Sequence, residues 1–214
     1  MAYEVTSAVE DPALVSRRRK QIVEAATELF ASAGYFKTSI KDIAKRAGVS
    51  PGLVYQYVTD KDDVLLLVLE QVVDAYAREL PPAIAKAGSP IARLEAAISA
   101  YCRIVDDMRA ATVLAYRSTK SLPKHKREVI QKKELATNTM ISDVVRECIE
   151  GGYIRDVEVD VFTYQIVMTA HGWALKSWYF KTVCTIDEYV RSSTDILLRG
   201  VLTKRGAAEF NPGS

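Results

Sequence analysis

Apolar residues recur at helical spacing along nearly the whole chain, and no segment shows the alternation of a half-buried strand. In the segment 21–30 the apolar positions fall at i, i+3, i+4, i+7 and i+8, which predicts one buried helix face. Two short helices are predicted next, the first between a cap at Ser39 and a stop at Gly48. The second is opened by Ser50-Pro51, a cap followed by proline at the first helical position, and runs to about Tyr57. The pattern therefore predicts an all-α chain.

The remaining helices are predicted to be longer. A fourth helix starting near Asp60 is expected to end at Pro81-Pro82, because proline lacks the amide donor and clashes with the preceding turn. Further helix starts are predicted at Ser89-Pro90, about Ala111, Leu122-Pro123, the acids near Asp160 and Thr185, and the helix that starts near Asp160 is expected to run through Phe180. The predicted architecture is a three-helix head followed by a larger helical body, about nine helices in all.

Four segments are predicted along the chain. Residues 1–16 show no clear period and are interpreted as a flexible N-terminal arm, and residues 17–60 form the head. Residues 61–205 form the helical body, and residues 206–214 are expected to be a disordered tail.

The charge is distributed unevenly between these segments. The 214 residues carry a net charge of +2 and are 49% hydrophobic, which is ordinary for a soluble globular protein and excludes disordered and low-complexity classes. The segment 17–58 holds eight basic and three acidic residues and is therefore +5, whereas the remainder is −3. A basic head suits binding to the phosphate backbone of nucleic acid. A solvated helix face is the alternative interpretation of the same charge.

The head contains a helix-turn-helix pattern. Its two short helices are separated by Ala47-Gly48-Val49-Ser50, and in this motif the second helix enters the major groove of DNA. The run 38–50, followed by Gly52, Tyr55, Tyr57 and Lys61, resembles the DNA-binding head of TetR-family transcriptional repressors. The resemblance is strong from Arg18 to Val64, while the body resembles the family only in architecture.

The resemblance implies a set of DNA contacts. Thr38 and Ser39 match the phosphate-contacting start of the second helix, and Lys61 matches a phosphate-contacting lysine. Leu53 and Gln56 depart from the common pattern, although leucine can pack on a thymine methyl group and glutamine can pair with adenine. For Tyr55, Tyr57 and Val58 a core position is the alternative, favoured for Val58. The DNA-binding residues so implied are Arg18, Lys37, Thr38, Ser39, Ser50, Pro51, Gly52, Leu53, Tyr55, Gln56, Tyr57 and Lys61.

The same resemblance implies that the body binds a small effector and dimerises through its last two long helices. The mixture of apolar and few polar side chains in the middle of the body is typical of a small-molecule site, although an aromatic stripe at helical spacing also suits a core or an interface. The candidate ligand-binding residues are Tyr101, Met108, Tyr116, Arg117, Met140, Phe162, Ile166, Thr169, His171 and Trp173.

The segment 172–178 is similar to TetR-family members that control fatty-acid, steroid or aromatic-acid catabolism and respond to acyl-CoA thioesters. Basic residues that would then meet the CoA phosphates are Arg103, Arg109, Arg117, Lys120, Lys124 and Lys126. A generic hydrophobic or multidrug inducer is the alternative effector.

The predicted function is a repressor that binds a palindromic DNA operator as a homodimer and is released by a hydrophobic effector. No catalytic residues, metal site or cofactor are expected, because only His125 and His171 are present, without metal-ligand spacing, and no Gly-rich phosphate loop occurs. An all-helical enzyme remains the alternative from a different class. The apolar run 64–69 is far shorter than the ~20 residues that span a membrane, and no signal peptide is recognisable, so a cytoplasmic location is expected.

Overall fold

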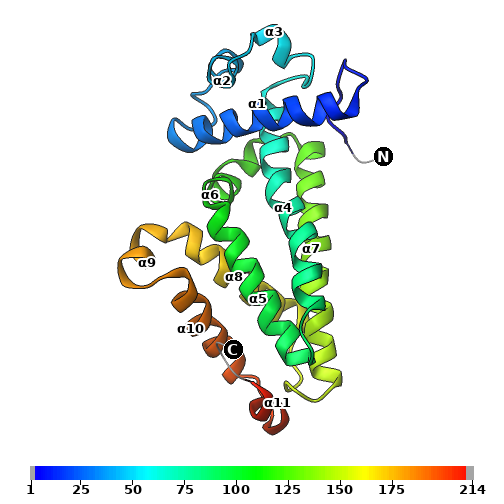
Figure 1. Ribbon diagram of the computed structural model, residues 1–214, viewed down its shortest axis with the longest axis vertical. Coiled ribbons are helices and arrows are strands. Elements are labelled where there is room, and N and C mark those ends of the chain that lie inside the picture. Colours follow the sequence, from blue (N-terminus) through cyan, green and yellow to red (C-terminus); the bar gives the residue numbers. More distant parts are fainter. Residues whose placement is uncertain (1–2, 211–214) are drawn as a thin grey trace. The chain divides into compact units, whose positions relative to one another are not determined.

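The computed structural model describes residues 3–210, and its regular elements in that range are helices (Figure 1). One isolated antiparallel bridge joins Ile154 to Leu202. The all-α prediction is therefore confirmed, with eleven α-helices in the described range where about nine were expected. They are α1 (Pro12–Ser32), α2 (Ile40–Ala47), α3 (Pro51–Val54), α4 (Lys61–Ala85), α5 (Pro90–Asp107), α6 (Arg109–Ser118), α7 (Lys124–Glu150), α8 (Val159–Leu175), α9 (Ser177–Val183), α10 (Ile186–Arg199) and α11 (Lys204–Glu209), with a 3-10 turn at Thr119–Ser121.

The described residues divide into two compact units. Unit 1 contains the residues up to Val73 together with Ala110–Lys133, and unit 2 contains Asp74–Arg109 and the residues from Glu134 onward. Helices α4 and α7 each contribute residues to both units. This division differs from the boundary expected at residue 60. Within unit 1, Lys126 of α7 pairs with the buried Asp63 of α4 and with Asp60, contacts that adjacent sequence does not reveal.

The head in unit 1 follows the predicted helices closely. Helix α1 buries the expected face, including Ile22 and Phe30, and packs against α2. Ser39 caps α2 in a capping box with Asp42, as the spacing predicts. Gly48 ends α2 with φ of 68°, a left-handed conformation that favours glycine, and so makes the tight turn toward α3.

Helix α3 is only four residues long and ends at Val54, earlier than the expected end near Tyr57. The Ser50 hydroxyl accepts a hydrogen bond from the Leu53 amide at 3.1 Å, and Pro51 occupies the first helical turn. Val54 is fully buried against the rest of the head. The cap and one buried side chain therefore hold a helix too short to be stable alone.

The N-terminal segment is not the loose arm that was expected over residues 1–16. Helix α1 already begins at Pro12, because the Asp11 carboxylate accepts hydrogen bonds from the amides of Ala13 and Leu14 at 2.9 and 3.2 Å. Residues 3–10 have no regular structure but contact the head, and Val5 is buried. Met1 and Ala2 lie outside the described residues.

Helix α4 continues through Pro81-Pro82 to Ala85, so the expected stop at the prolines is wrong. Proline fixes φ near the helical value, but each of the two prolines removes a main-chain donor and crowds the carbonyl four residues before it. Leu80 directly before them is completely buried. Burial of α4 side chains therefore offsets the missing hydrogen bonds and the helix persists for another turn.

Unit 2 is built around α5 and α8, which pack against each other, with α10 in contact with both. The helix expected to run through Phe180 is instead two helices, because Lys176 leaves the helical region with φ of −118° and ψ of 23°. Thr185 caps α10 in a capping box with Glu188, at the start predicted for the last long helix.

The tail expected from residue 206 is helical as far as Glu209. Thr203 caps α11 by accepting a hydrogen bond from the Gly206 amide at 3.1 Å. Gly206 lies so close to the Tyr153 carbonyl that a Cβ atom there would clash with its oxygen. Close packing and a cap therefore order this segment, while residues 211–214 lie outside the described range.

Among the residues described, no helix is long and apolar enough to cross a membrane. The same part of the chain contains no group of three or more His, Cys, Asp or Glu side chains placed to hold a metal ion.

Candidate DNA-binding surface and effector region

The start of α2 and the end of α3 border a concavity of about 620 Å³ on unit 1. Five of the predicted DNA-binding residues line it, and together they bring two lysines, two hydroxyls and an aromatic ring to one surface. The lining residues are Phe36, Lys37, Thr38, Ser39, Ile40, Lys41, Tyr55, Thr59, Asp60 and Lys61. The structure therefore places Lys37, Thr38, Ser39, Tyr55 and Lys61 together.

The hydroxyls at the start of α2 are already engaged within the head. Ser39 Oγ donates to the Asp42 carboxylate at 2.6 Å and accepts from the Asp42 amide at 3.2 Å. The Ser39 hydroxyl and amide hold the pKa of Asp42 below its usual value, so this carboxylate is charged at neutral pH. Thr38 is buried and donates to the Gly34 carbonyl at 2.9 Å. Thr38 thus shapes the turn, and the exposed Ser39 is the hydroxyl that faces solvent.

Lys61 joins the start of α4 to the turn before α2. Its Nζ donates to the carbonyl oxygens of Tyr35 and Thr38, both at 3.0 Å, and lies 4.3 Å from the centre of the Tyr35 ring. The Tyr35 hydroxyl in turn donates to Asp62, and burial together with that carboxylate raises the pKa of Tyr35. An ammonium has three donors. Two of them hold Lys61 at the concavity, which leaves one for an anion.

The recognition helix offers a mixed surface. Pro51 and Gly52 are exposed, Leu53 is partly exposed, and 55% of Tyr55 is accessible to solvent. Gln56 directs its side chain to solvent. These residues are therefore available to base edges, and Ser50 supports them as the cap of α3.

Tyr57 and Val58 are both buried, each 2% exposed. A core position for Val58 agrees with the favoured interpretation. The expectation that Tyr57 contacts DNA is wrong in this structure, because its ring packs inside the head. The signal that could have separated Tyr55 from Tyr57 is their spacing, since residues two apart face opposite sides of a helical turn.

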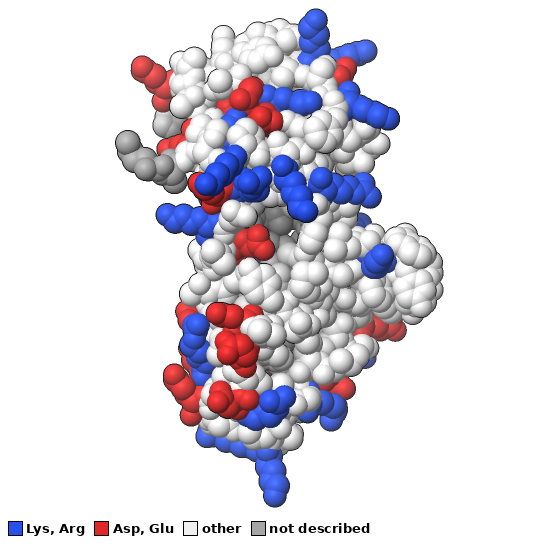
Figure 2. All heavy atoms as spheres, turned by 180° about the vertical axis from the view of Figure 1, so that it is seen from behind, with Lys and Arg blue, Asp and Glu red and all other residues white. Residues whose placement is uncertain are grey.

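The basic run at the start of α1 is partly committed to internal contacts. Arg18 donates to the Gln21 side chain at 2.9 Å, and Gln21 donates to the Ala47 carbonyl at 2.7 Å, so Arg18 braces the turn between α2 and α3. Arg19 donates to three carbonyls of the head and the N-terminal segment. Arg17 and Lys20 are exposed. Figure 2 shows Lys and Arg side chains projecting from the part of unit 1 that contains α1–α3.

The candidate effector residues of unit 2 centre on a buried polar cluster. Tyr101 of α5 stacks on Tyr76 of α4 with ring centres 4.1 Å apart. The hydroxyls of Tyr76 and Tyr101 lie 3.4 and 3.3 Å from Nε2 of His171. Burial lowers the pKa of His171 to about 4, so the imidazole is neutral at physiological pH. Tyr76 was not among the candidate effector residues, and its place in this cluster depends on how α4 packs against α5 and α8.

Trp173 belongs to a second, adjacent group of aromatic side chains. Its ring centre lies 5.0 Å from that of Tyr189 and 6.1 Å from that of Phe180. The indole Nε1 donates to Asp106 at 2.9 Å, and the Tyr189 hydroxyl donates to the Thr169 carbonyl at 2.7 Å. Trp173 is therefore a fully hydrogen-bonded core residue.

The other candidate effector residues separate into two groups. Phe162 and Ile166 are buried in unit 2, where Met108, Met140 and Thr169 are partly exposed. Tyr116 and Arg117 belong to unit 1 and are exposed. The expected availability of Lys126 to CoA phosphates is wrong, because Lys126 is 2% exposed and paired with Asp60 and Asp63.

Unit 2 also contains buried polar groups that sequence reasoning missed. Asn138 and Thr163 are buried, and neither the Asn138 amide nor the Thr163 hydroxyl has a hydrogen-bond partner within the described residues. A buried polar group without a partner is costly, so these two side chains are candidates for contact with a bound ligand. A polar residue in an amphipathic helix gives no such signal by itself.

Comparison with known proteins places these features in a family. Residues 22–68 match the model described as bacterial regulatory proteins, tetR family, and residues 87–201 match a tetracyclin repressor-like C-terminal domain. The chain is 48% identical to the HTH-type transcriptional regulator HbdR of Aromatoleum sp. (strain CIB) over 205 residues, covering 96% of this chain and 90% of that protein. It is 25% identical to the HTH-type transcriptional repressor KstR2 of Mycobacterium tuberculosis, covering 90% and 96% of the two chains.

Solved structures share the fold. The structure of the ketosteroid transcriptional regulator KstR2 of Mycobacterium tuberculosis gives a TM-score of 0.73 at 23% identity, covering 94% of this chain and 100% of that one. The structure of AibR in complex with isovaleryl coenzyme A and operator DNA gives 0.73 at 18% identity, covering 85% and 98%.

Proposed function

Because the chain belongs to the TetR family of DNA-binding transcriptional regulators, we propose that it is a repressor whose dimer binds a palindromic operator and is released by a hydrophobic effector. Its relatives are transcriptional regulators, and the chain is a regulator and not an enzyme. The observation that carries the DNA-binding part of the proposal is the concavity on unit 1, where Lys37 and Lys61 present ammonium donors beside the exposed Ser39 and Tyr55.

Selection of bound duplexes from a random-sequence pool by the full-length protein tests this proposal. An inverted repeat whose half-site centres lie about one DNA turn or a multiple apart is expected, because a two-fold dimer presents two recognition helices. Recovery of no preferred sequence at moderate salt would contradict sequence-specific repression.

Replacing Lys61 with alanine should weaken binding to all duplexes, whatever their sequence. The slope of log affinity against log salt concentration should fall by about one unit, as for the loss of one phosphate contact. The matched control is Lys45→Ala, which removes the same charge from an exposed position of α2 outside the concavity. Equal slopes for wild type and Lys61→Ala, measured by fluorescence anisotropy, would remove Lys61 from the phosphate footprint.

The dimer is proposed to form through α8 and α10. Helix α8 exposes Val161, Tyr164, Gln165 and Met168 at spacings of three and four residues, which is one mostly apolar face. Helix α10 exposes 77% of Ile196. Exposed apolar helix faces of this kind suit burial against a second copy.

Ile196→Arg should therefore convert the dimer into a monomer, since an unpaired charge in an apolar interface is strongly unfavourable. Light scattering after size-exclusion chromatography measures the mass. Leu135→Arg is the control, because it introduces the same charge at a 57% exposed leucine of α7. A dimer that persists in Ile196→Arg at micromolar concentration would rule out this interface.

The effector proposed is an acyl-CoA thioester that binds in unit 2. Support comes from the apolar side chains around the Tyr76–Tyr101–His171 cluster, from the unpartnered polar groups of Asn138 and Thr163, and from the isovaleryl coenzyme A bound by AibR. Helix α4 contains residues of both units, so a change in its direction is the proposed path to the head. Native mass spectrometry of protein purified from its own host, followed by displacement from the selected duplex by acyl-CoAs, tests the assignment. Displacement by another hydrophobic compound and by no thioester would favour a generic inducer.

A further inference from the structure

The turn that follows the recognition helix is held by the N-terminal segment. The carbonyl of Gln56 accepts a hydrogen bond from the amide of Ala8 at 2.8 Å and another from the Ser7 hydroxyl at 3.1 Å. The carbonyls of Leu53 and Val54 at the end of α3 accept hydrogen bonds from the amides of Gln56 and Tyr57. The N-terminal segment instead bonds the turn that follows α3, where Tyr55 and Gln56 are exposed.

Arg19 fastens this segment to the head. Its Nη2 donates to the carbonyls of Val5 and Thr6 at 2.7 and 3.0 Å, and its Nε donates to the carbonyl of Tyr57 at 3.1 Å. One guanidinium thus joins α1, the N-terminal segment and the chain leaving α3. A planar fork with five fixed donors suits such a junction better than any other side chain.

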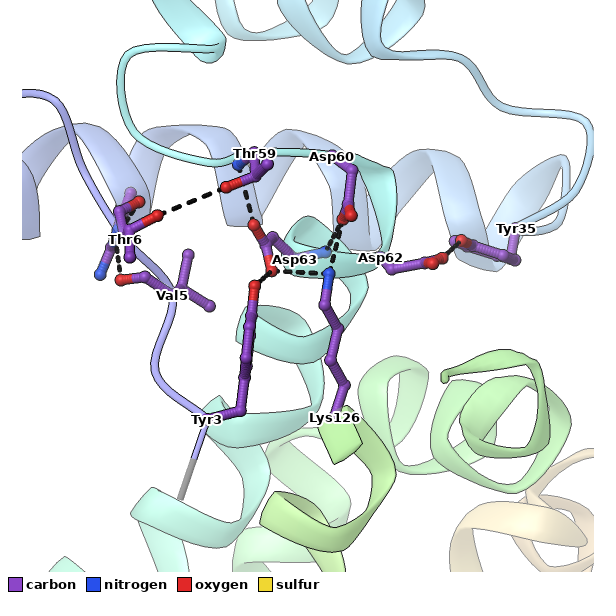
Figure 3. Close-up of polar contacts among 10 residues, drawn as sticks. Tyr3, Val5, Thr6, Tyr35, Thr59, Asp60, Asp62, Asp63 and Lys126 are labelled. Carbon is purple, nitrogen blue, oxygen red and sulfur yellow. Dashed lines mark hydrogen bonds and ion pairs between the residues drawn. The ribbon is translucent and has the colours of Figure 1, made fainter. Parts of the chain in front are cut away.

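The beginning of the segment is anchored at a buried ion cluster (Figure 3). The Tyr3 hydroxyl donates to Asp63 at 2.6 Å, and Asp63 accepts from the Thr59 amide at 2.8 Å. Lys126 of α7 pairs with the same Asp63 at 2.8 Å and with Asp60 at 2.7 Å. Its Nζ also lies 5.2 Å from the centre of the Tyr3 ring. Asp63 is completely buried, so the anchor is fixed.

We propose that residues 3–8 form an N-terminal clamp that sets the position of the recognition helix, with Arg19 as its positioning residue. The helix that it holds has only four residues and cannot fix its own orientation. The side chain of Arg19 points its donors to internal carbonyls, so its contribution to DNA binding is geometric and not a phosphate contact. The clamp therefore acts on sequence-specific binding, which depends on where base-contacting side chains lie. This inference rests on DNA binding by the helix-turn-helix.

The test compares Arg19→Ala with Arg17→Ala in the full-length protein. Both variants lose one positive charge from α1, but Arg17 is exposed and no contact joins it to the clamp. Affinity is measured for the duplex selected from the random pool and for a scrambled duplex of the same composition. Arg19→Ala should lower the ratio of specific to non-specific affinity by about tenfold, since hydrogen bonds to a charged donor are lost. Arg17→Ala should leave the ratio unchanged, because a lost charge weakens both duplexes equally.

Hydrogen exchange of residues 53–58 without DNA gives a second readout. Exchange there should accelerate in Arg19→Ala, and also in Tyr3→Phe, which removes only the hydroxyl that binds Asp63. Binding is measured well below the unfolding temperature of each variant. If Arg19→Ala does not fold, Tyr3→Phe still allows the proposal to be tested. Equal affinity ratios and equal exchange in Arg19→Ala, Tyr3→Phe and Arg17→Ala would overturn the clamp. If wild type itself prefers no duplex, sequence-specific DNA binding fails, and the exchange comparison still decides whether the segment holds α3.

Discussion

Replacing Lys126 with methionine should lower the free energy of unfolding of unit 1 by about 3–5 kcal/mol, because it leaves a buried carboxylate without its partner. Lys126 is 2% exposed and Asp63 is not exposed at all. Burial opposes the charge on Lys126, but its hydrogen bonds with Asp60 and Asp63 outweigh this and raise its pKa. Burial likewise opposes the charge on Asp63, and the hydrogen bonds from Lys126 and Tyr3 nevertheless lower its pKa. Both groups are therefore charged in the folded state.

The two pKa shifts also define the pH range of the effect. The contribution of Asp63, whose folded pKa is depressed, is present above its ordinary value near 3.8 and is lost as the pH falls. The contribution of Lys126, whose folded pKa is raised, is present below 10.5 and is lost as the pH rises beyond it. Urea unfolding followed by circular dichroism should give the same loss for Lys126→Met at pH 6 and at pH 8.

Two further variants distinguish the effect of the buried Lys126–Asp63 pair on stability from the effect of removing any lysine charge. Lys133→Met removes another lysine of α7 that pairs with α4, through Glu70 at 2.8 Å, but the lysine side chain is 37% exposed. Its loss should cost less than about 1 kcal/mol. Adding Asp63→Asn to Lys126→Met removes the orphan charge and should restore part of the stability. Equal losses for Lys126→Met and Lys133→Met would show that the ion cluster does not stabilise the head.

His171 should make unit 2 less stable in mild acid. Its folded pKa of about 4 lies below the ordinary value of 6.5, so the unfolded state binds more protons between these two values. Stability is therefore present above about pH 6.5 and is lost as the pH falls toward 4. The His171 contribution should fall by about 2 kcal/mol between pH 8 and pH 5. His171→Gln cannot be protonated in this pH range, so it should lack this pH-dependent loss of stability.

The measurement is the difference between wild type and His171→Gln in urea unfolding at the two pH values. Burial raises the pKa of Glu95 to about 7, so this residue stabilises the fold at low pH and acts in the opposite sense. Glu95 contributes equally to wild type and to His171→Gln, so the difference between the two proteins removes its effect. The pH dependence of wild type alone would still contain it. A difference that is independent of pH would mean that the imidazole is solvated and not buried in the Tyr76–Tyr101 cluster.

The predictable parts of the fold are those decided by neighbours in sequence. The capping box at Ser39, the turn at Gly48 and the proline after Ser50 each act within a few residues, and the structure has all of them. The predicted helix end at Pro81-Pro82 and the predicted flexible arm were wrong. Contacts with residues far away in the sequence determine the structure of both segments. Burial carries α4 past its prolines, and contacts with Arg19 and Asp63 order the N-terminal segment.

The candidate DNA-binding surface could also be predicted only in part from the sequence. Lys37, Ser39, Tyr55 and Lys61 were implied by the resemblance of the helix-turn-helix to the TetR family, and they line one concavity. Tyr57 and Lys126 look like surface residues in sequence, yet one is core and the other completes an ion cluster. No local pattern shows that a lysine is buried, because its partners lie 63 and 66 residues away along the chain, at Asp63 and Asp60.

The proline pair in α4 has a mechanical consequence. Pro81 and Pro82 have no amide hydrogen, so the carbonyls of Ala77 and Arg78 receive no helical hydrogen bond from them. Bending elsewhere in a helix stretches a hydrogen bond on its convex side, but here two of those bonds are already missing. This turn is therefore more compliant than a fully hydrogen-bonded turn of the same 25-residue helix. Alanines in its place would make α4 stiffer and more stable, and a stiffer rod resists the change of direction that a ligand-driven regulator needs.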